Sequence, residues 1–249
     1  MTSAIAVIGK SGSGKTTFVK ALLNSINTGY PEKSVLLVDC DLTGELSQAF
    51  GVDIKDTIWH IRTGDFRYKT QLPYVMTKQE YIDWTLQETI VSLYGETDLI
   101  VSGPLYTKEC SCFAGGLINS ALAKFISHYD FVIFDSEYDL EYLRNLTEYH
   151  IDAAVIVSPP TTDAVFSSFK IKQSSLLNCS PGQIGLILNK VENSNLPLEI
   201  SDLCDEYDLD ILGVLPFEES LKNNPVSRVS PLLNQKVKEL IYRLNLPKN

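Results

Sequence analysis

Seven apolar runs of strand length recur along the 249-residue chain, and they restrict its possible folds more than any other sequence feature. They are rich in Val and Ile, and polar residues do not alternate with the apolar ones. The runs are residues 3–9, 34–40, 98–103, 130–136, 153–158, 184–189 and 210–215. Uninterrupted apolar strands are typical of a parallel sheet whose two faces are both covered.

Helical patterns lie between these strands, at 16–26, 117–127 and 162–177. The alternation predicts βαβ units, and therefore an α/β fold with a doubly wound, mainly parallel sheet flanked by helices. Residues 51–97 interrupt it with aromatic residues and helical patterns near 56–63 and 78–93. Because no linker rich in Gly, Ser or Pro bounds this segment, we expect a helical insertion within a single domain spanning 1–249.

The formal net charge of −10 disfavours nonspecific binding to nucleic acid, because an acidic surface repels phosphate backbones. No apolar run approaches the roughly 20 residues needed to span a bilayer, so we expect no transmembrane helix. The first residues carry no basic region ahead of their apolar stretch, unlike a signal peptide. We therefore expect a cytoplasmic protein whose thiols stay reduced.

The segment GKSGSGKT at 9–16 fits the phosphate-loop pattern G-x-x-x-x-G-K-[ST] between the first strand and the first helix. Glycines let backbone N–H groups turn inward around a phosphate at the positive end of the helix dipole. Lys15 is expected to reach the β- and γ-phosphates, and the Thr16 hydroxyl to bind Mg²⁺. The predicted nucleotide contacts here are Gly9, Lys10, Ser11, Gly12, Ser13, Gly14, Lys15, Thr16 and Thr17.

The second lysine of the loop, Lys10, makes the segment similar to the deviant phosphate loop of the family that contains MinD, ParA and nitrogenase iron protein. In that family this lysine reaches across a two-fold axis to the partner's nucleotide. The resemblance implies an ATPase that forms a homodimer, with Lys10 and Lys15 acting in catalysis. An exposed lysine without a role is the alternative.

Acidic residues follow two of the predicted strands, where they would lie beside the phosphate loop. Asp135 is the expected carboxylate that holds Mg²⁺ through water. In the resembled family the residue matching Asp41 helps to position the attacking water, and the one matching Asp39 lies near the metal. Helix capping is the alternative for each of these three residues.

Two later segments resemble the adenine site of the same family. Asn189, at the end of the strand in ILNK, resembles the asparagine that contacts adenine. Pro216 and Phe217 resemble the loop that lines the other side of the base. The resemblance therefore implies ATP or ADP as the nucleotide.

Cys110 and Cys112 form a Cys-x-Cys pair just before a predicted helix. In an extended chain their sulfur atoms project to one side, and the helix dipole favours thiolates. Two thiolates are half of a four-ligand metal site. The other half would come from a second copy of the chain, since a two-fold axis would assemble four sulfurs. Two buried thiols without a metal are the alternative.

Residues 102–122, 129–147 and 152–160 closely resemble the nickel-insertion accessory ATPases of carbon monoxide dehydrogenase (CooC type). The resemblance implies a nucleotide-dependent homodimer that carries Ni²⁺, with Zn²⁺ possible, on its four cysteines. It also implies a client metalloenzyme such as carbon monoxide dehydrogenase. Glu109 and Asp139 depart from the family pattern, and an acid at Asp139 facing phosphate would slow hydrolysis.

Two other functions fit part of this pattern. An electron-transfer ATPase similar to nitrogenase iron protein would hold an iron–sulfur cluster on four cysteines. That family takes its ligands from two distant loops, and the second loop here, IFDSEYD, has no cysteine. A MinD-like positioning ATPase would use the amphipathic segment 236–244 on a membrane. We expect this segment instead to be a helix that closes the α/β domain.

Overall fold

A computed structural model of the protein describes residues 2–41, 44–63, 76–103, 113–137, 140–147, 149–192, 196–217 and 231–244. Its strands are β1 (Ser3–Ile8), β2 (Val35–Asp39), β3 (Val91–Ser92), β4 (Thr97–Val101), β5 (Phe131–Ser136), β6 (Ala153–Ser158), β7 (Gln183–Val191) and β8 (Ile211–Pro216). All seven predicted strands are therefore present. The short strand β3 was not predicted.

The eight strands form one sheet in the order β3-β4-β2-β5-β1-β6-β7-β8. Every described strand pair is parallel except β3 with β4, which is antiparallel. The chain leaves β1 at the middle of the sheet and builds strands on both sides of it. The predicted doubly wound α/β fold is confirmed.

The described helices are α1 (Lys15–Gly29), α2 (Glu45–Phe50), α3 (Ile58–Thr63), α5 (Lys78–Glu88), α6 (Phe113–Ile126), α7 (Leu140–Leu146), α8 (Thr162–Asn178), α9 (Leu198–Glu206) and α11 (Pro231–Arg243). The segment 51–97 contains α3 and α5, as predicted, and also β3. That the whole chain is one domain stays a prediction.

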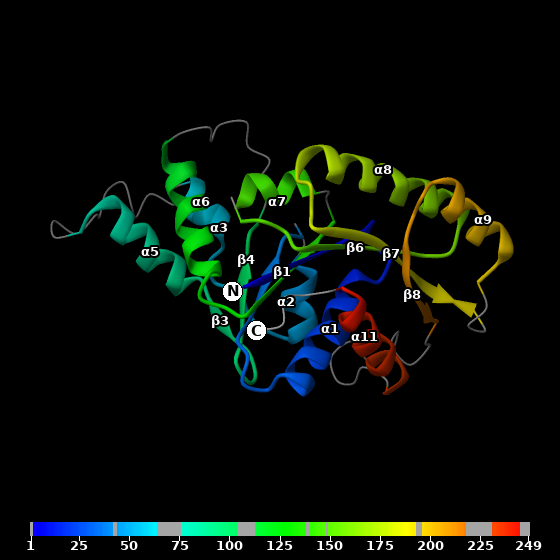
Figure 1. Ribbon diagram of the computed structural model, residues 1–249. Coiled ribbons are helices and arrows are strands. Elements are labelled where there is room, and N and C mark those ends of the chain that lie inside the picture. The colour runs from blue at the N-terminus through cyan, green and yellow to red at the C-terminus, as the bar shows by residue number, and fades with distance from the viewer. Residues whose placement is uncertain are drawn as a thin grey trace.

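Helices cover both faces of the sheet (Figure 1). Because successive side chains of a strand point to opposite faces, Ile5 and Val7 of β1 join the core under α1, α2 and α11. Ala4, Ala6 and Ile8 join the core on the other face, under α3, α5, α6 and α7, while α8 and α9 cover β6 and β7 there. The sheet is therefore buried from both sides, which accounts for the uninterrupted apolar runs.

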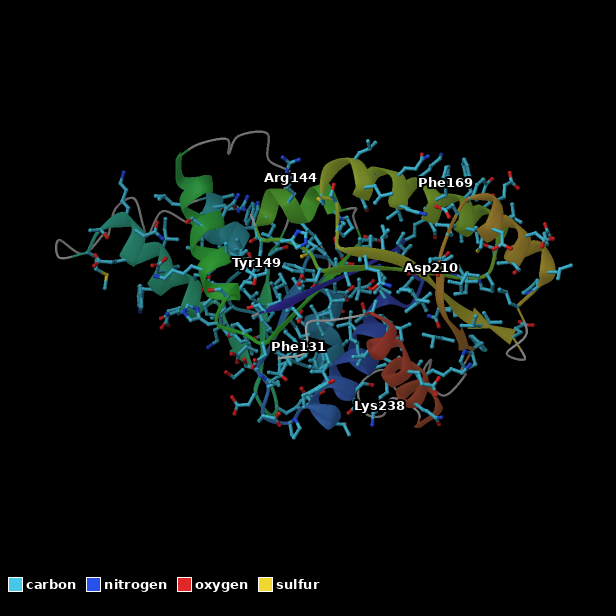
Figure 2. The ribbon with its side chains drawn as sticks, in the orientation of Figure 1. Phe131, Arg144, Tyr149, Phe169, Asp210 and Lys238 are labelled. Atoms are coloured by element: carbon cyan, nitrogen blue, oxygen red, sulfur yellow. The ribbon has the colours of Figure 1, made fainter. Side chains whose placement is uncertain are left out.

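The helix α11 closes the domain against α1, as expected from segment 236–244. Its apolar residues Val237, Leu240 and Ile241 are buried in the same core cluster as Phe18 and Leu22 of α1. The neighbouring Lys238 is exposed on the outer side of the helix (Figure 2). Among the described residues, no helix is long and apolar enough to cross a membrane.

Replacing Leu240 by alanine should destabilise the protein by about 2–4 kcal/mol, because the substitution leaves a cavity between α11 and α1. Leu240 is 2% exposed. Urea unfolding followed by circular dichroism measures the change in free energy. Lys238→Ala, on the exposed side of the same helix, is the matched control. It should change stability by less than about 0.5 kcal/mol. Equal effects of the two substitutions would contradict the packing of α11.

Candidate functional site

The phosphate loop, residues 9–16, runs from β1 into α1 at the edge where the parallel strands end. A Cβ on Gly9 would collide with the backbone carbonyl of Val157, so the loop can approach β6 only with glycine here. Gly14 has a φ of 97°, and a Cβ there would collide with the side-chain amide of Asn189. These two glycines let the loop turn tightly against β6 and β7.

Lys15 lies inside this loop and is 3% exposed. Its ammonium group donates a hydrogen bond to the backbone carbonyl of Lys10 at 3.3 Å. The Lys10 side chain, in contrast, is exposed to solvent. The first turn of α1 has no acidic residue that would neutralise the positive end of the helix dipole. The loop therefore presents a buried cation and a helix N-terminus at the same place.

Thr16 and Asp135 form a hydrogen-bonded pair beneath the loop. The Thr16 hydroxyl donates to Asp135 Oδ2 at 2.9 Å. Asp135 Oδ1 is buried and has no hydrogen-bond partner among the residues that the structure describes. Burial, helped by the nearby Asp39, raises the pKa of Asp135 to about 7 against the lowering effect of the Thr16 hydrogen bond. A hydroxyl beside an unsatisfied carboxylate oxygen fits the oxygen ligands that Mg²⁺ prefers.

Asp39 and Asp41 lie next to this pair at the end of β2, where Asp39 is aligned with Asp135 of β5. Both acids are buried. Asp39 accepts hydrogen bonds from the backbone N–H groups of Asp41, at 3.0 Å, and of Ser47, at 3.1 Å. Burial raises the pKa of Asp39 to about 6 in spite of these two hydrogen bonds, which act to lower it. Asp39 thus holds the turn toward α2, and its role beside Mg²⁺ stays a prediction.

No group of three or more His, Cys, Asp and Glu side chains able to hold a metal occurs within the described ranges. This is compatible with Mg²⁺ at Thr16 and Asp135, because protein-bound Mg²⁺ usually takes few protein ligands and completes its shell with water and phosphate oxygens.

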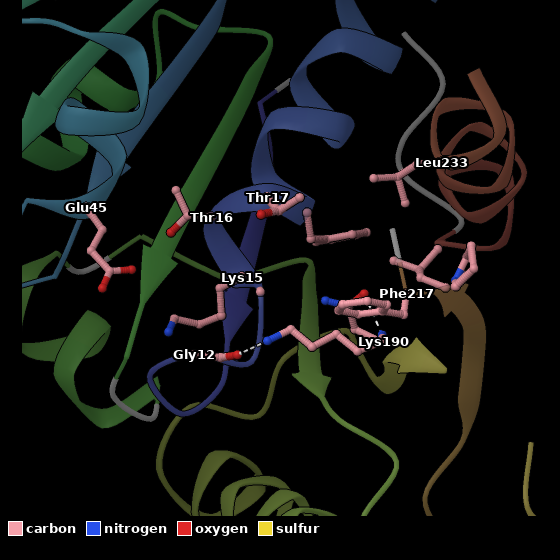
Figure 3. Close-up of a pocket in the computed structure, with 13 residues that line it drawn as sticks. Gly12, Lys15, Thr16, Thr17, Glu45, Lys190, Phe217 and Leu233 are labelled. Carbon is pink, nitrogen blue, oxygen red and sulfur yellow. Dashed lines mark hydrogen bonds between the residues drawn. The ribbon is translucent and has the colours of Figure 1, made fainter. Parts of the chain in front are cut away.

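A cavity of about 290 Å³ opens beside the loop (Figure 3). The predicted contacts that line it are Gly12, Gly14, Lys15, Thr16, Thr17, Asn189, Pro216 and Phe217. The fold thus brings the ends of β7 and β8 to the phosphate loop, as the adenine-site resemblance requires. Base binding by Asn189, Pro216 and Phe217 stays a prediction.

Sequence reasoning missed five residues that line the same cavity, namely Phe18, Glu45, Lys190, Leu215 and Leu233. Lys190 is the most consequential, because its ammonium group donates to the backbone carbonyl of Gly12. Lys190 directly follows Asn189, a predicted nucleotide contact, and this adjacency is the sequence feature that could have indicated a role for Lys190.

Cys110 and Cys112 lie outside the described residues, as do Glu109 and Asp139. The helix predicted to follow the cysteine pair is present, since α6 begins at Phe113. Cys40 and Cys204 are buried thiols outside any disulfide, and the half-buried Cys179 thiol donates to the Leu140 carbonyl at 2.9 Å. Burial raises the pKa of the Cys40 thiol well above its usual value, which keeps that residue a neutral thiol.

A glycine-rich loop between a buried strand and a helix, with an enclosed lysine and a Thr–Asp pair beneath it, defines a P-loop nucleotide-binding domain. Residues 4–232 match the family CbiA, described as the CobQ/CobB/MinD/ParA nucleotide binding domain. The chain belongs to this family and is an ATPase of the P-loop type.

Two relatives are uncharacterized ATP-binding proteins of Methanocaldococcus jannaschii. One is 26% identical over 245 residues, covering 96% of this chain and 94% of the relative. The other is 27% identical over 236 residues, covering 87% of this chain and 86% of the relative.

Two solved structures share the fold. The septum site-determining protein MinD of Pyrococcus horikoshii, complexed with Mg-ADP, has a TM-score of 0.68 at 19% identity and covers 98% of this chain and 96% of its own. A ParA family ATPase of Chlorobium tepidum has a TM-score of 0.66 at 16% identity and covers 97% and 91%. These similarities establish the fold.

Proposed function

We propose that this ATPase is a nucleotide-driven dimeric switch that carries a metal ion on Cys110 and Cys112 and delivers it to a metalloenzyme. The observation that supports nucleotide-dependent switching is the Thr16–Asp135 pair beneath the phosphate loop. In this pair one buried carboxylate oxygen has no hydrogen-bond partner among the described residues. The metal cargo rests on the sequence, namely the Cys-x-Cys pair before α6 and the resemblance to nickel-insertion ATPases.

ATP binds with its phosphates in the loop and its base in the adjoining cavity. Lys15 holds the phosphates, and Mg²⁺ at Thr16 and Asp135 neutralises charge on the β- and γ-phosphate oxygens when bound. Asp41 orients the attacking water. Two observations support an adenine nucleotide as the ligand. The relatives are described as ATP-binding proteins, and the similar MinD was solved with Mg-ADP.

The proposed dimerisation rests on the resemblance of Lys10 to the lysine that reaches the partner's nucleotide, and the exposed position of the Lys10 side chain is compatible with it. A two-fold axis places two Cys-x-Cys pairs together, and their four thiolates form the metal site. Nickel is the cargo favoured by the family resemblance, and zinc suits the same thiolates. A carbon monoxide dehydrogenase-like enzyme is the client that the resemblance favours. Residues 1–249 act as one domain in this proposal.

A MinD-like positioning role gains no support from α11, because the apolar face that would contact lipid is buried against α1. An iron–sulfur electron-transfer role would need the same four cysteines, and anaerobic reconstitution followed by visible absorption distinguishes it from nickel binding.

Replacing Cys112 by alanine should abolish stoichiometric nickel binding. The change removes one thiolate from each subunit, so we expect the affinity for Ni²⁺ to fall by more than about 100-fold, beyond what loss of an outer-shell partner costs. Nickel titration of the anaerobic protein with and without ATP, together with its mass in solution, measures both binding and dimerisation.

Cys179→Ala is the matched control for this titration, since it removes a half-buried thiol from the end of α8. It should bind nickel as the wild type does. Equal, weak nickel binding by wild type and Cys112→Ala would refute the metal cargo and leave the ATPase switch standing.

A further inference from the structure

The end of β7 has an irregular backbone at the point where it meets the phosphate loop. The pairing of β7 with β8 shifts register between Leu188 and Val191. Within this interval Lys190 has a φ of 62°, a left-handed conformation that is unfavourable for a residue with a Cβ. Such strain at a site edge calls for a reason that involves the side chain, because glycine would adopt the conformation without steric strain.

The irregularity lets two consecutive residues reach the same target. In a regular strand, Asn189 and Lys190 would point to opposite faces of the sheet. Here Asn189 Nδ2 donates to the backbone carbonyl of Ser13 at 2.9 Å. Lys190 Nζ donates to the carbonyl of Gly12 at 2.5 Å (Figure 3). The Asn189 side chain also accepts from the Lys190 backbone N–H at 2.9 Å, which fixes the two residues relative to each other. A bulge that re-aims side chains in this way is a common device beside functional sites.

These two bonds fix the orientation of two successive peptide groups of the loop. In a planar trans peptide the N–H points away from the C=O. A Ser13 carbonyl held toward β7 therefore turns the Gly14 N–H away from β7. The Gly12 carbonyl belongs to the peptide whose N–H, on Ser13, closes a turn onto the Lys10 carbonyl at 3.1 Å. That same Lys10 carbonyl accepts the hydrogen bond from Lys15.

We propose that Lys190 is a positioning residue that acts with Asn189 as a two-point clamp on the phosphate loop. The clamp keeps the Gly12–Ser13 peptide in its turn onto the Lys10 carbonyl. It also keeps the next peptide turned so that the Gly14 N–H points away from β7 and can receive a phosphate oxygen. Because Lys190 also lines the cavity beside Phe217, the wall of the base site and the backbone of the phosphate site are joined through one side chain. The inference rests on nucleotide binding at this loop and does not depend on the metal cargo.

The test compares Lys190→Met, Lys190→Gly and Lys190→Arg for binding of MgADP and of adenosine. Lys190→Met should weaken MgADP binding by about tenfold, because it removes a charged hydrogen bond to the loop, and Lys190→Arg should restore most of the affinity. Adenosine has no phosphates, so its affinity should stay within about twofold. Isothermal titration calorimetry measures the first and saturation-transfer NMR the second.

Lys190→Gly separates the clamp from general stability. This variant relieves the left-handed strain, so its thermal midpoint should equal or exceed that of wild type while MgADP binds as weakly as to Lys190→Met. Lys172→Met is the matched control, because Lys172 of α8 also donates to the carbonyl of a left-handed residue, Asp208, and neither residue lines the cavity. It should bind MgADP like the wild type.

The clamp is overturned if Lys190→Met and Lys190→Gly bind MgADP within about twofold of wild type. It is also overturned if adenosine loses affinity by the same factor as MgADP, since Lys190 would then act on the base alone. Failure of the wild type itself to bind MgADP would refute the proposed nucleotide switch together with the clamp, and the two failures are thereby distinguished.

Discussion

Replacing Lys10 by alanine is expected to lower the rate of ATP hydrolysis by about 10³-fold, the lower end of the effect of a cation supplied by a partner subunit. The affinity of each subunit for MgADP should change by no more than about twofold. The two effects differ because the Lys10 side chain is exposed, whereas its backbone carbonyl, which alanine retains, accepts from Lys15 and from the Ser13 N–H. Steady-state phosphate release and calorimetric titration with MgADP measure the two quantities.

A mixing experiment shows whether Lys10 acts on its own nucleotide or on that of the partner subunit. A heterodimer of Lys10→Ala with Lys15→Ala contains one intact nucleotide site, and in trans this site receives Lys10 from the other subunit. Mixing the two inactive variants should therefore restore about a quarter of the wild-type rate, because half of the dimers are mixed and each has one working site of two. If the mixture stays as inactive as its components, Lys10 does not act across the interface.

Replacing Lys15 by alanine should weaken MgADP binding and lower hydrolysis, each by about 10²- to 10³-fold. Lys15 is almost completely buried inside the loop, so its ammonium group acts on the phosphates with little screening by water. Fluorescence titration with a labelled ADP and phosphate release under saturating ATP measure the two losses.

Lys20→Ala is the control for Lys15→Ala, since it removes one charge from the same helix. Lys20 donates to the Ala49 carbonyl and lies over the Phe50 ring, away from the cavity lining. Its substitution should lower stability without changing the affinity for MgADP. Equal nucleotide affinity of Lys15→Ala and wild type would show that the loop does not hold phosphate through this lysine.

The order and type of the main strands could be predicted from sequence, because strands buried on both faces are apolar throughout. β3 could not, since two residues, Val91 and Ser92, are too few to show a period. Its pairing with β4 depends on how the chain returns after α5. The start of α11 at Pro231 was also missed, although Leu233 lies one turn before Val237 and is buried in the same core, so the apolar stripe did extend beyond the predicted segment.

Much of the candidate site was likewise predictable, because a phosphate loop depends on local sequence and because the ends of parallel strands meet at one edge. Thr16 and Asp135 come together for this reason. The contact of Lys190 with Gly12 could not be predicted, since it depends on a register shift between β7 and β8. Nor does any local pattern reveal that both oxygens of Asp39 accept backbone N–H groups.

The packing of α11 on α1 has a consequence for biosynthesis. The helix that opens at the phosphate loop buries its apolar face against a helix that is translated roughly 200 residues later, and such distant contacts form late in folding. While the ribosome makes the intervening strands, Phe18 and Leu22 lack their partners and are available to chaperones. A nascent chain stalled before α11 should therefore expose this face of α1 and bind nucleotide poorly, although its phosphate loop is already complete.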